Sequence, residues 1–219
     1  MTMKITAIEP QKRNPQRVNV YLDGAFAFGL TRITAAWLQT GQDISDEKIT
    51  TLQAEDASEI AYQKALHFLS YRPRSSREIR QNLLRRGIAL PQVEETLTRL
   101  QCAGLVNDLE FARAWVENRS TFQPRSKIAL RMELRRKGLE DDVIQPVLDE
   151  SVDDDTLALA AARKYARRLV GLELQEFRLK LVGYLARRGF SYPTLTPVIP
   201  KVWRELHSAD DPDKNEHKD

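Results

Sequence analysis

The sequence has little of what catalytic and metal-binding chemistry requires. Its 219 residues include one cysteine and three histidines, and no His/Cys cluster has the spacing of a zinc site. A single cysteine excludes an intramolecular disulfide and fits a reducing compartment. No glycine-rich loop precedes Lys-Ser or Lys-Thr, so a phosphate-binding loop is not expected. The sequence therefore predicts a protein that is not an enzyme and that uses no cofactor and no metal ion.

Long apolar runs and an apolar leader are also lacking. No run approaches the roughly 18–20 apolar residues that a membrane helix needs, and Met1-Thr2-Met3-Lys4 does not open a secretory h-region. We therefore expect a cytoplasmic protein without membrane contact. The lone Cys102 lies among leucines and is predicted to be a small core residue rather than a reactive thiol.

Positive charge, by contrast, is abundant outside the C-terminal tail. The chain holds 34 Lys and Arg against 31 Asp and Glu, a net charge of +3. The tail from Ser208 contributes −3, because it has five acidic residues and two lysines, so the rest of the chain carries +6. This excess favours an acidic partner.

A basic string that ends in glycine recurs three times. It occupies residues 83–88, 134–139 and 185–190, and Gly87, Gly138 and Gly189 are each 51 residues apart. A basic last turn followed by Gly is a common helix ending, because cations favour the C-terminus and Gly accepts the left-handed conformation. Three such endings at one spacing mark an internal repeat.

Apolar residues accompany each copy at i, i+4 helical spacing, which predicts the buried stripes of two short helices. Burial of one such leucine contributes roughly 1.5–3 kcal/mol. A further helix precedes Pro-Arg-Ser at 73–75 and 124–126, and the natural N-caps of the helix that follows are Ser75 or Ser76 in the first copy and Ser126 in the second. Each copy is thus three helices, and stacked copies share a core. The apolar positions are Ile79, Leu83, Val93 and Leu97, then Leu130, Leu134, Ile144 and Leu148, then Leu181, Leu185, Leu195 and Ile199.

The first 30 residues have a different pattern. Apolar and polar residues alternate over 18–22, Asp23-Gly24 makes a two-residue turn, and Phe26, Phe28 and Leu30 alternate on the return, which predicts a β-hairpin. A short helix is expected over residues 31–39, and a helical segment from Asp43 or Ser45 onward.

The predicted fold class is mainly α, an elongated tandem array of three-helix repeats with a small N-terminal domain that contains a β-hairpin. The expected divisions are an N-terminal extension over 1–50, repeats over 51–106, 107–152 and 153–207, and a disordered acidic tail over 208–219. Asp153-Asp154-Asp155 is interpreted as capping of the helix that follows, since no second acidic cluster faces it to hold a metal ion.

The basic residues around each second helix are the candidate binding residues. One explanation is helix solubility and dipole complementation. The other is a surface for carboxylate or phosphate, which the strong bias toward one charge favours and which suits the planar fork of arginine. The candidates are Arg74, Arg77, Arg85, Arg86, Arg125, Lys127, Arg131, Arg135, Arg136, Lys137, Arg187 and Arg188.

The order and spacing of these motifs resemble the RecX family of bacterial regulatory proteins. The resemblance covers about residues 55–206 and is carried by Pro-Arg-Ser with Glu78, by Leu-Arg-Arg-x-Gly, and by the segments 104–108, 111–116 and 134–139. The third copy departs from the pattern, because it lacks Pro-Arg-Ser.

The resemblance implies a non-enzymatic regulator of the RecA recombinase that acts in recombination, DNA repair and the SOS response. Such a protein lies in the helical groove of the RecA–DNA filament and inhibits ATP hydrolysis, strand exchange and coprotease activity. The partners implied are the RecA filament and, more weakly or through RecA, single- or double-stranded DNA, and a monomer is expected. Two alternatives remain open: a stand-alone DNA-binding helical repeat protein and a plain helical scaffold.

Overall fold

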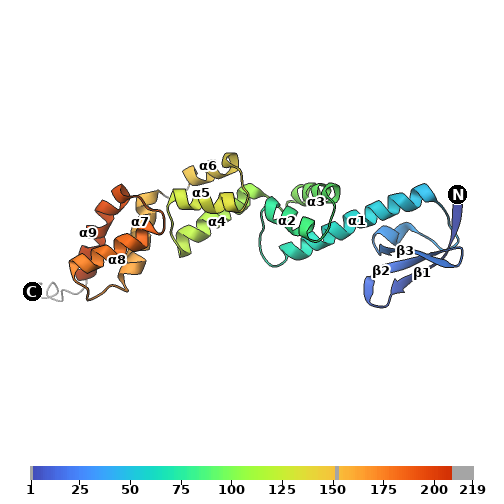
Figure 1. Cartoon of the computed structure of the whole chain (residues 1–219), viewed down its shortest axis with the longest axis horizontal. Helices are drawn as coiled ribbons and strands as arrows, with labels where there is room; N and C mark the ends of the chain where they lie inside the picture. The colour runs from blue at the N-terminus through green and yellow to red at the C-terminus, as the bar shows by residue number, and fades with distance from the viewer. Residues whose placement is uncertain (1, 151–152, 209–219) are drawn as a thin grey trace, which may run out of the picture. The chain divides into compact units, whose positions relative to one another are not determined.

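The computed structural model describes residues 2–150 and 153–208 (Figure 1). The chain divides after Val106 into two compact units. The first unit holds a small sheet and one three-helix repeat, and the second holds two further repeats. Over the described residues the fold is mainly α with a small N-terminal sheet, so the predicted fold class is confirmed.

The N-terminal sheet is antiparallel, in the order β3-β2-β1-β4. The strands are β1 (Thr2–Gln11), β2 (Asn14–Leu22), β3 (Ala25–Thr31) and β4 (Asp43–Ser45). The predicted hairpin joins β2 to β3 through Asp23 and Gly24, which both have positive φ, 47° and 85°, as the favoured two-residue hairpin turn requires. Val18, Val20, Leu22, Phe28 and Leu30 form the buried face of this hairpin.

Phe26 does not share the buried face that the alternation predicts. The register shifts between the pairs Val20↔Phe28 and Tyr21↔Phe26, so β3 has one more residue than β2 at this point. Such a bulge moves the next side chain to the other face of the sheet. Phe26 is consequently exposed and its ring meets Tyr21 edge-on, at 6.0 Å between centroids.

Two short elements after the hairpin differ from the prediction. The helix expected over residues 31–39 is a single 3-10 turn, η1 (Thr34–Trp37). Of the two starts expected for the next helix, Asp43 and Ser45, the second is correct, because Asp43 lies in β4, which pairs with Thr2–Lys4 of β1 and satisfies backbone groups at that edge. Ser45 then caps the next helix, because its side chain accepts the backbone N–H of Lys48 at 3.2 Å.

Two buried carboxylates fix helix α1 (Asp46–Leu69), which runs unbroken from the sheet into the first repeat. Asp56 accepts the backbone N–H of Thr31 at 2.5 Å and Arg17 Nη2 at 3.1 Å. One turn later, Glu59 accepts Arg99 Nη1 at 2.8 Å from another helix of the repeat. Because a buried charge is costly unless it is paired, these contacts fix how α1 packs on the sheet and within the repeat.

Each repeat consists of three helices (Figure 1). Repeat 1 is α1, α2 (Ser76–Arg85) and α3 (Leu90–Cys102), and repeat 2 is α4 (Asp108–Phe122), α5 (Lys127–Arg136) and α6 (Asp141–Glu150). Repeat 3 is α7 (Asp154–Ala166), α8 (Leu174–Ala186) and α9 (Tyr192–Ser208). All twelve apolar positions predicted from the 51-residue spacing are buried, which confirms the repeat.

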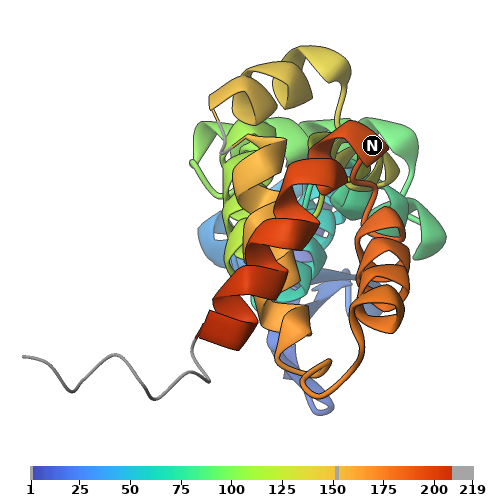
Figure 2. The ribbon, with the colours of Figure 1, turned by 90° about the vertical axis from the view of Figure 1, so that its left-hand side faces the viewer.

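The third helix varies in length among the repeats, since α3 has 13 residues, α6 has ten and α9 has 17. Figure 2 shows α9 beside α7, and α8, at their side, packs against both. The acids at the start of α7 have the predicted capping role, since Asp153 accepts the backbone N–H of Thr156 at 3.0 Å.

The hydrophobic side chains form three cores. One lies under the sheet, one lies in repeat 1, and one is shared by repeats 2 and 3. The prediction that stacked copies share a core is therefore confirmed for repeats 2 and 3. Leu130 and Leu134 of α5, and Leu181 and Leu185 of α8, are fully buried in that shared core.

Repeats 2 and 3 meet at a buried serine and a glycine. Ser126 Oγ accepts the backbone N–H of Ala129 at 3.2 Å, and the Ser126 N–H donates to the carbonyl of Arg188 at 3.1 Å. Gly189 has φ +88°, and a Cβ added there would lie 2.6 Å from Ser126 Oγ and 2.9 Å from Ala129 Cβ. Glycine is therefore required both by its backbone conformation and by the close approach.

The prediction that Cys102 is a small core residue is wrong, because Cys102 is exposed. The buried face of α3 carries Val93, Leu97 and Leu100, and Cys102, at the C-terminal end of the helix, follows Leu100 by two residues. A shift of two residues turns a side chain away from its neighbour's face. The tail predicted over 208–219 lies outside the described residues, apart from Ser208 at the end of α9.

Replacement of Gly189 should destabilise the protein more than replacement of its repeat equivalent Gly87. Gly87→Ala is the control, since φ is +77° and nothing lies within 4 Å of an added Cβ, so it introduces only the left-handed strain of about 1–2 kcal/mol. Gly189→Ala adds overpacking of about 1–3 kcal/mol. Thermal unfolding followed by circular dichroism measures the difference, and equal losses of stability in the two variants would contradict the close contact.

Candidate partner-binding surface

The twelve candidate basic residues gather around the second helix of each repeat. Arg74 and Arg125 lie in the loops before α2 and α5, while the basic strings lie at the C-terminal ends of α2, α5 and α8. Cations at these ends complement the partial negative charge of the helix C-terminus. The structure separates the twelve into residues that the chain itself holds and residues that it leaves available.

Two arginines on α5 are held by polar groups at or on α6. Arg135 forms a bidentate pair with Asp141, with Nε 2.9 Å from Oδ1. The hydrogen bond from Arg135 lowers the pKa of Asp141 below its ordinary value of 3.8, so the carboxylate stays charged at neutral pH and the pair is lost only in acid. Arg131 Nη2 donates to Gln145 Oε1. Arg135 is therefore occupied at physiological pH.

Glu133 is the centre of a charged network on the same helix, and its side chain is only 13% exposed. It accepts Trp115 Nε1 at 2.8 Å and Arg119 Nε at 2.8 Å from α4. Arg125 Nε lies 3.0 Å from its other carboxylate oxygen. A buried carboxylate that three donors approach links α4, α5 and the Pro-Arg-Ser loop.

Three further candidates, Arg74, Lys137 and Arg188, lie against aromatic rings. The guanidinium of Arg74 lies 4.0 Å from the Phe68 ring centroid, and Lys137 Nζ lies 4.9 Å from that of Trp115. Desolvation by burial, followed by the nearby charge of Arg72, lowers the pKa of Arg74. Such cation–π contacts hold a charge in place.

Arg188 is a junction residue. Its Nη1 donates to the carbonyl of Pro124 at 3.0 Å, and its guanidinium lies 4.5 Å from the Tyr184 ring centroid. Its backbone carbonyl receives the Ser126 N–H. These contacts join repeat 3 to the Pro-Arg-Ser loop of repeat 2, which gives Arg188 a structural role that the sequence motif alone does not reveal.

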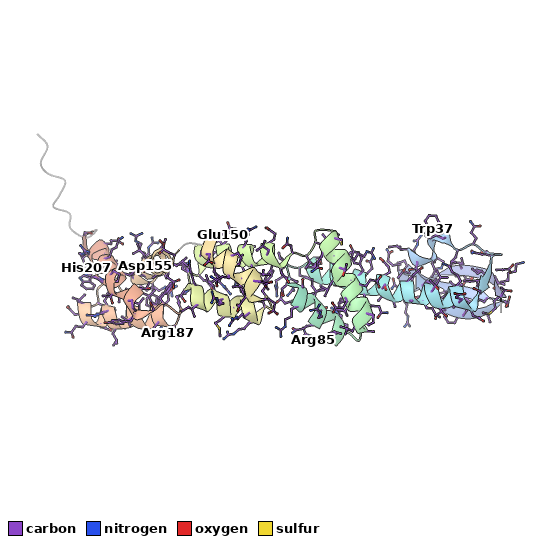
Figure 3. All side chains as sticks on the ribbon, turned by 90° about the horizontal axis from the view of Figure 1, so that it is seen from above. Trp37, Arg85, Glu150, Asp155, Arg187 and His207 are labelled. Atoms are coloured by element: carbon purple, nitrogen blue, oxygen red, sulfur yellow. The ribbon has the colours of Figure 1, made fainter. Side chains whose placement is uncertain are left out.

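The remaining six candidates make no ion pair with any residue in the described ranges 2–150 and 153–208. Among them, Arg85, Arg136 and Arg187 occupy the same position of each repeat, two residues before the glycine, and all three are exposed. Figure 3 labels Arg85, whose Nε donates to the backbone carbonyl of Gln81 at 3.2 Å, and Arg187. We call these three residues the repeat-end arginines. The others are Arg77, Arg86 and Lys127.

Sequence reasoning missed two features. Glu133, Trp115 and Arg119 were not recognised as a network, although Trp115 and Arg119 share a face of α4 by i, i+4 spacing. It also missed a groove of about 650 Å³ in the first unit, between the β2–β3 hairpin and α1. Arg32 and Lys64 line this groove without an ion pair among the described residues. Three segments that are distant in the sequence line the groove, so no local motif could have predicted it.

Two kinds of site are not found over the part of the chain that the structure describes. No three His, Cys, Asp or Glu residues among residues 2–150 and 153–208 are grouped so that they could hold a metal ion. No helix in those same ranges is long and apolar enough to cross a membrane.

Comparison with known proteins gives consistent matches along the chain. Residues 3–45 match the N-terminal domain of regulatory protein RecX, and residues 61–100, 107–148 and 153–194 match its first, second and third three-helix domains. Regulatory protein RecX of Bacillus pumilus is 34% identical over 97% of this chain and 81% of its own length. That of Bacillus subtilis is 30% identical over 96% and 80%.

Two solved structures are similar in fold. A crystal structure of regulatory protein RecX superposes with a TM-score of 0.69 at 26% identity, covering 90% of this chain and 98% of the other. The crystal structure of RecX from Lactobacillus salivarius gives a TM-score of 0.56 at 24% identity, covering 70% of this chain and 99% of the other.

Removal of the Glu133 carboxylate should destabilise the second unit. Glu133→Ala leaves Trp115 Nε1 and Arg119 without their acceptor, and loss of such a half-buried group costs about 1–3 kcal/mol. Glu117→Ala is the matched control, since Glu117 is exposed and makes no ion pair among the described residues, so its change should stay within about 0.5 kcal/mol. Urea unfolding followed by tryptophan fluorescence tests this, and similar free energies for both variants would contradict the network.

Proposed function

The chain belongs to the RecX family of regulatory proteins, and we propose that it binds RecA–DNA filaments in their helical groove and inhibits RecA. The inhibited activities are ATP hydrolysis, strand exchange and coprotease activity, so the protein acts in recombination, DNA repair and the SOS response. It works in the cytoplasm as a monomer and catalyses no reaction itself. Its partners are the RecA filament and, through it, DNA.

The observation that carries this proposal is the recurrence of one available arginine in each repeat. Arg85, Arg136 and Arg187 are exposed, equivalent by the 51-residue spacing, and without an ion pair among the described residues. A filament presents the same surface on successive protomers. Repeats that each offer the same cationic contact gain affinity from every protomer engaged, without the need for any single strong contact.

Other arginines of the same motifs are already paired within the chain, so they are not expected to contact the filament. Arg135 pairs with Asp141 and Arg125 approaches Glu133, so these two charges are largely neutralised within the chain. Arg136, one residue from Arg135, has no such partner among the described residues. Since the fork of arginine matches carboxylate and phosphate, the available arginines are the ones that a filament is expected to engage.

Neutralisation of the repeat-end arginines should weaken inhibition of RecA. The variant Arg85→Gln, Arg136→Gln, Arg187→Gln is compared with Arg13→Gln, Arg168→Gln, Arg204→Gln, which removes three exposed arginines elsewhere and changes the net charge equally. We expect the first variant to need about tenfold more protein for half-inhibition of RecA ATPase on single-stranded DNA, since each lost contact also lowers the avidity.

The control variant should inhibit like the unmodified protein. Equal weakening of inhibition in both variants would show that only the net charge matters. Unchanged inhibition by the first variant would exclude the repeat-end arginines as contacts. Failure of the unmodified protein to inhibit RecA at any concentration would refute the proposed function itself.

One observation favours a second candidate function, stand-alone DNA binding. On α2, the exposed positions Arg77, Gln81 and Arg85 are all polar, and both arginines are available, which suits a phosphate backbone. This candidate predicts tight binding of DNA without recombinase and a steep loss of affinity with salt, with a slope of about −0.9 per phosphate contacted. Titration of labelled DNA at several salt concentrations, with and without RecA, separates the two. Affinity that appears only with RecA supports the filament regulator.

A further inference from the structure

The second helix of each repeat has a stripe of outward-facing positions. The three stripes are equivalent because their positions are 51 residues apart in the sequence. The three positions of each stripe are i, i+4 and i+8, so they lie on one face of the helix, and the third position is the repeat-end arginine. The stripe consists of residues 77, 81 and 85 on α2, residues 128, 132 and 136 on α5, and residues 179 and 183 on α8 with the C-cap residue 187. The opposite faces of α5 and α8 are buried in the shared core.

On α5 and α8 the stripe begins with large aliphatic side chains in solvent. Ile128 is 68% exposed, Met132 is 48% exposed and Leu179 is 74% exposed. A single exposed apolar residue needs no explanation. Here Ile128 and Leu179 occupy the same repeat position, and each precedes an available arginine by two turns of the same helix. This repetition indicates a contact surface.

The arginine of repeat 3 lies along this stripe. Arg187 Nη1 is 3.4 Å from the place that a Cβ on Gly183 would occupy, so the guanidinium folds back over the glycine toward the aliphatic end. Met132 stands at the position of Gly183 in repeat 2. The stripes of α5 and α8 therefore each combine an aliphatic surface with one adjacent positive charge.

The composition of the stripe indicates the class of partner. In repeat 1 the stripe is Arg77, Gln81 and Arg85 and has no aliphatic residue. A nucleic-acid backbone would use the arginines of α5 and α8 but would leave Ile128 and Leu179 without apolar contacts. Protein interfaces, by contrast, are enriched in methionine and arginine at well-packed centres from which water is excluded.

We propose that the stripes of α5 and α8 dock on a protein surface, an aliphatic hollow with an adjacent carboxylate on successive recombinase protomers. Ile128 and Met132, and Leu179 in repeat 3, fill the hollow, while Arg136 and Arg187 pair with the carboxylate. This inference rests on the proposed function and names the surface that performs it. The α2 stripe, which has no aliphatic residue, is not part of this apolar contact.

The test replaces the aliphatic side chains and keeps the charge. Ile128→Gln with Leu179→Gln is compared with Leu90→Gln with Leu105→Gln, which removes two exposed leucines outside the stripes. Glutamine favours a helix as well as isoleucine does, so helicity by circular dichroism should be unchanged. Binding of the labelled full chain is measured to RecA filaments on single-stranded DNA with a slowly hydrolysed ATP analogue, and to the same DNA without RecA.

We expect the stripe variant to bind filaments about tenfold more weakly, with unchanged binding to DNA alone, while the control variant binds like the unmodified chain. Filament binding by the stripe variant within twofold of the control would overturn the inference and leave the proposed function intact. A parallel loss of binding to DNA alone would also overturn it, because the stripe would then be a nucleic-acid surface. If the unmodified chain bound no filaments, the proposed function would fail, and this inference with it.

Discussion

The apolar pair on the second helix of each repeat is the constraint that orders the rest of the structure. Ile79 and Leu83, with their equivalents on α5 and α8, are fully buried. Once these side chains face the core, helical geometry directs the residues two positions away to solvent. The repeat-end arginines therefore face solvent because the apolar pair faces the core. Three copies of one packing solution therefore produce three copies of one exposed charge.

The charges of the chain have two different tasks. Asp56 and Glu59 are buried and paired, and they fix α1 on the sheet and within repeat 1. Glu133 does the same for α4 and α5. Arginines that these or other groups hold, such as Arg188 at the junction of repeats 2 and 3, stabilise the fold. Arginines without such partners remain available for an external carboxylate or phosphate, and the proposed function depends on this second group.

The candidate site was predictable as a region but not as individual residues. Arg135 and Arg136 are adjacent in one motif, and nothing local distinguishes them. Only the packing of α5 against α6 shows that Asp141 engages Arg135 and leaves Arg136 available. Likewise, Phe26 fits an alternating pattern, yet a bulge between β2 and β3 turns it to solvent. Pairing across elements depends on register and on helix rotation, and neither is encoded in a spacing.

The sequence by itself determined the repeat, its three helices, the glycine endings and the twelve buried apolar positions, because these follow from helical periodicity within short segments and from the 51-residue spacing between them. It also predicted the hairpin turn at Asp23-Gly24, where the required backbone conformation selects the residues. Tertiary structure alone decided which charges are neutralised. It also decided that only glycine fits at position 189 beside Ser126, and that Ile128 and Leu179 remain exposed. These outcomes depend on atoms brought together from distant segments, whose contacts arise only when the helices pack.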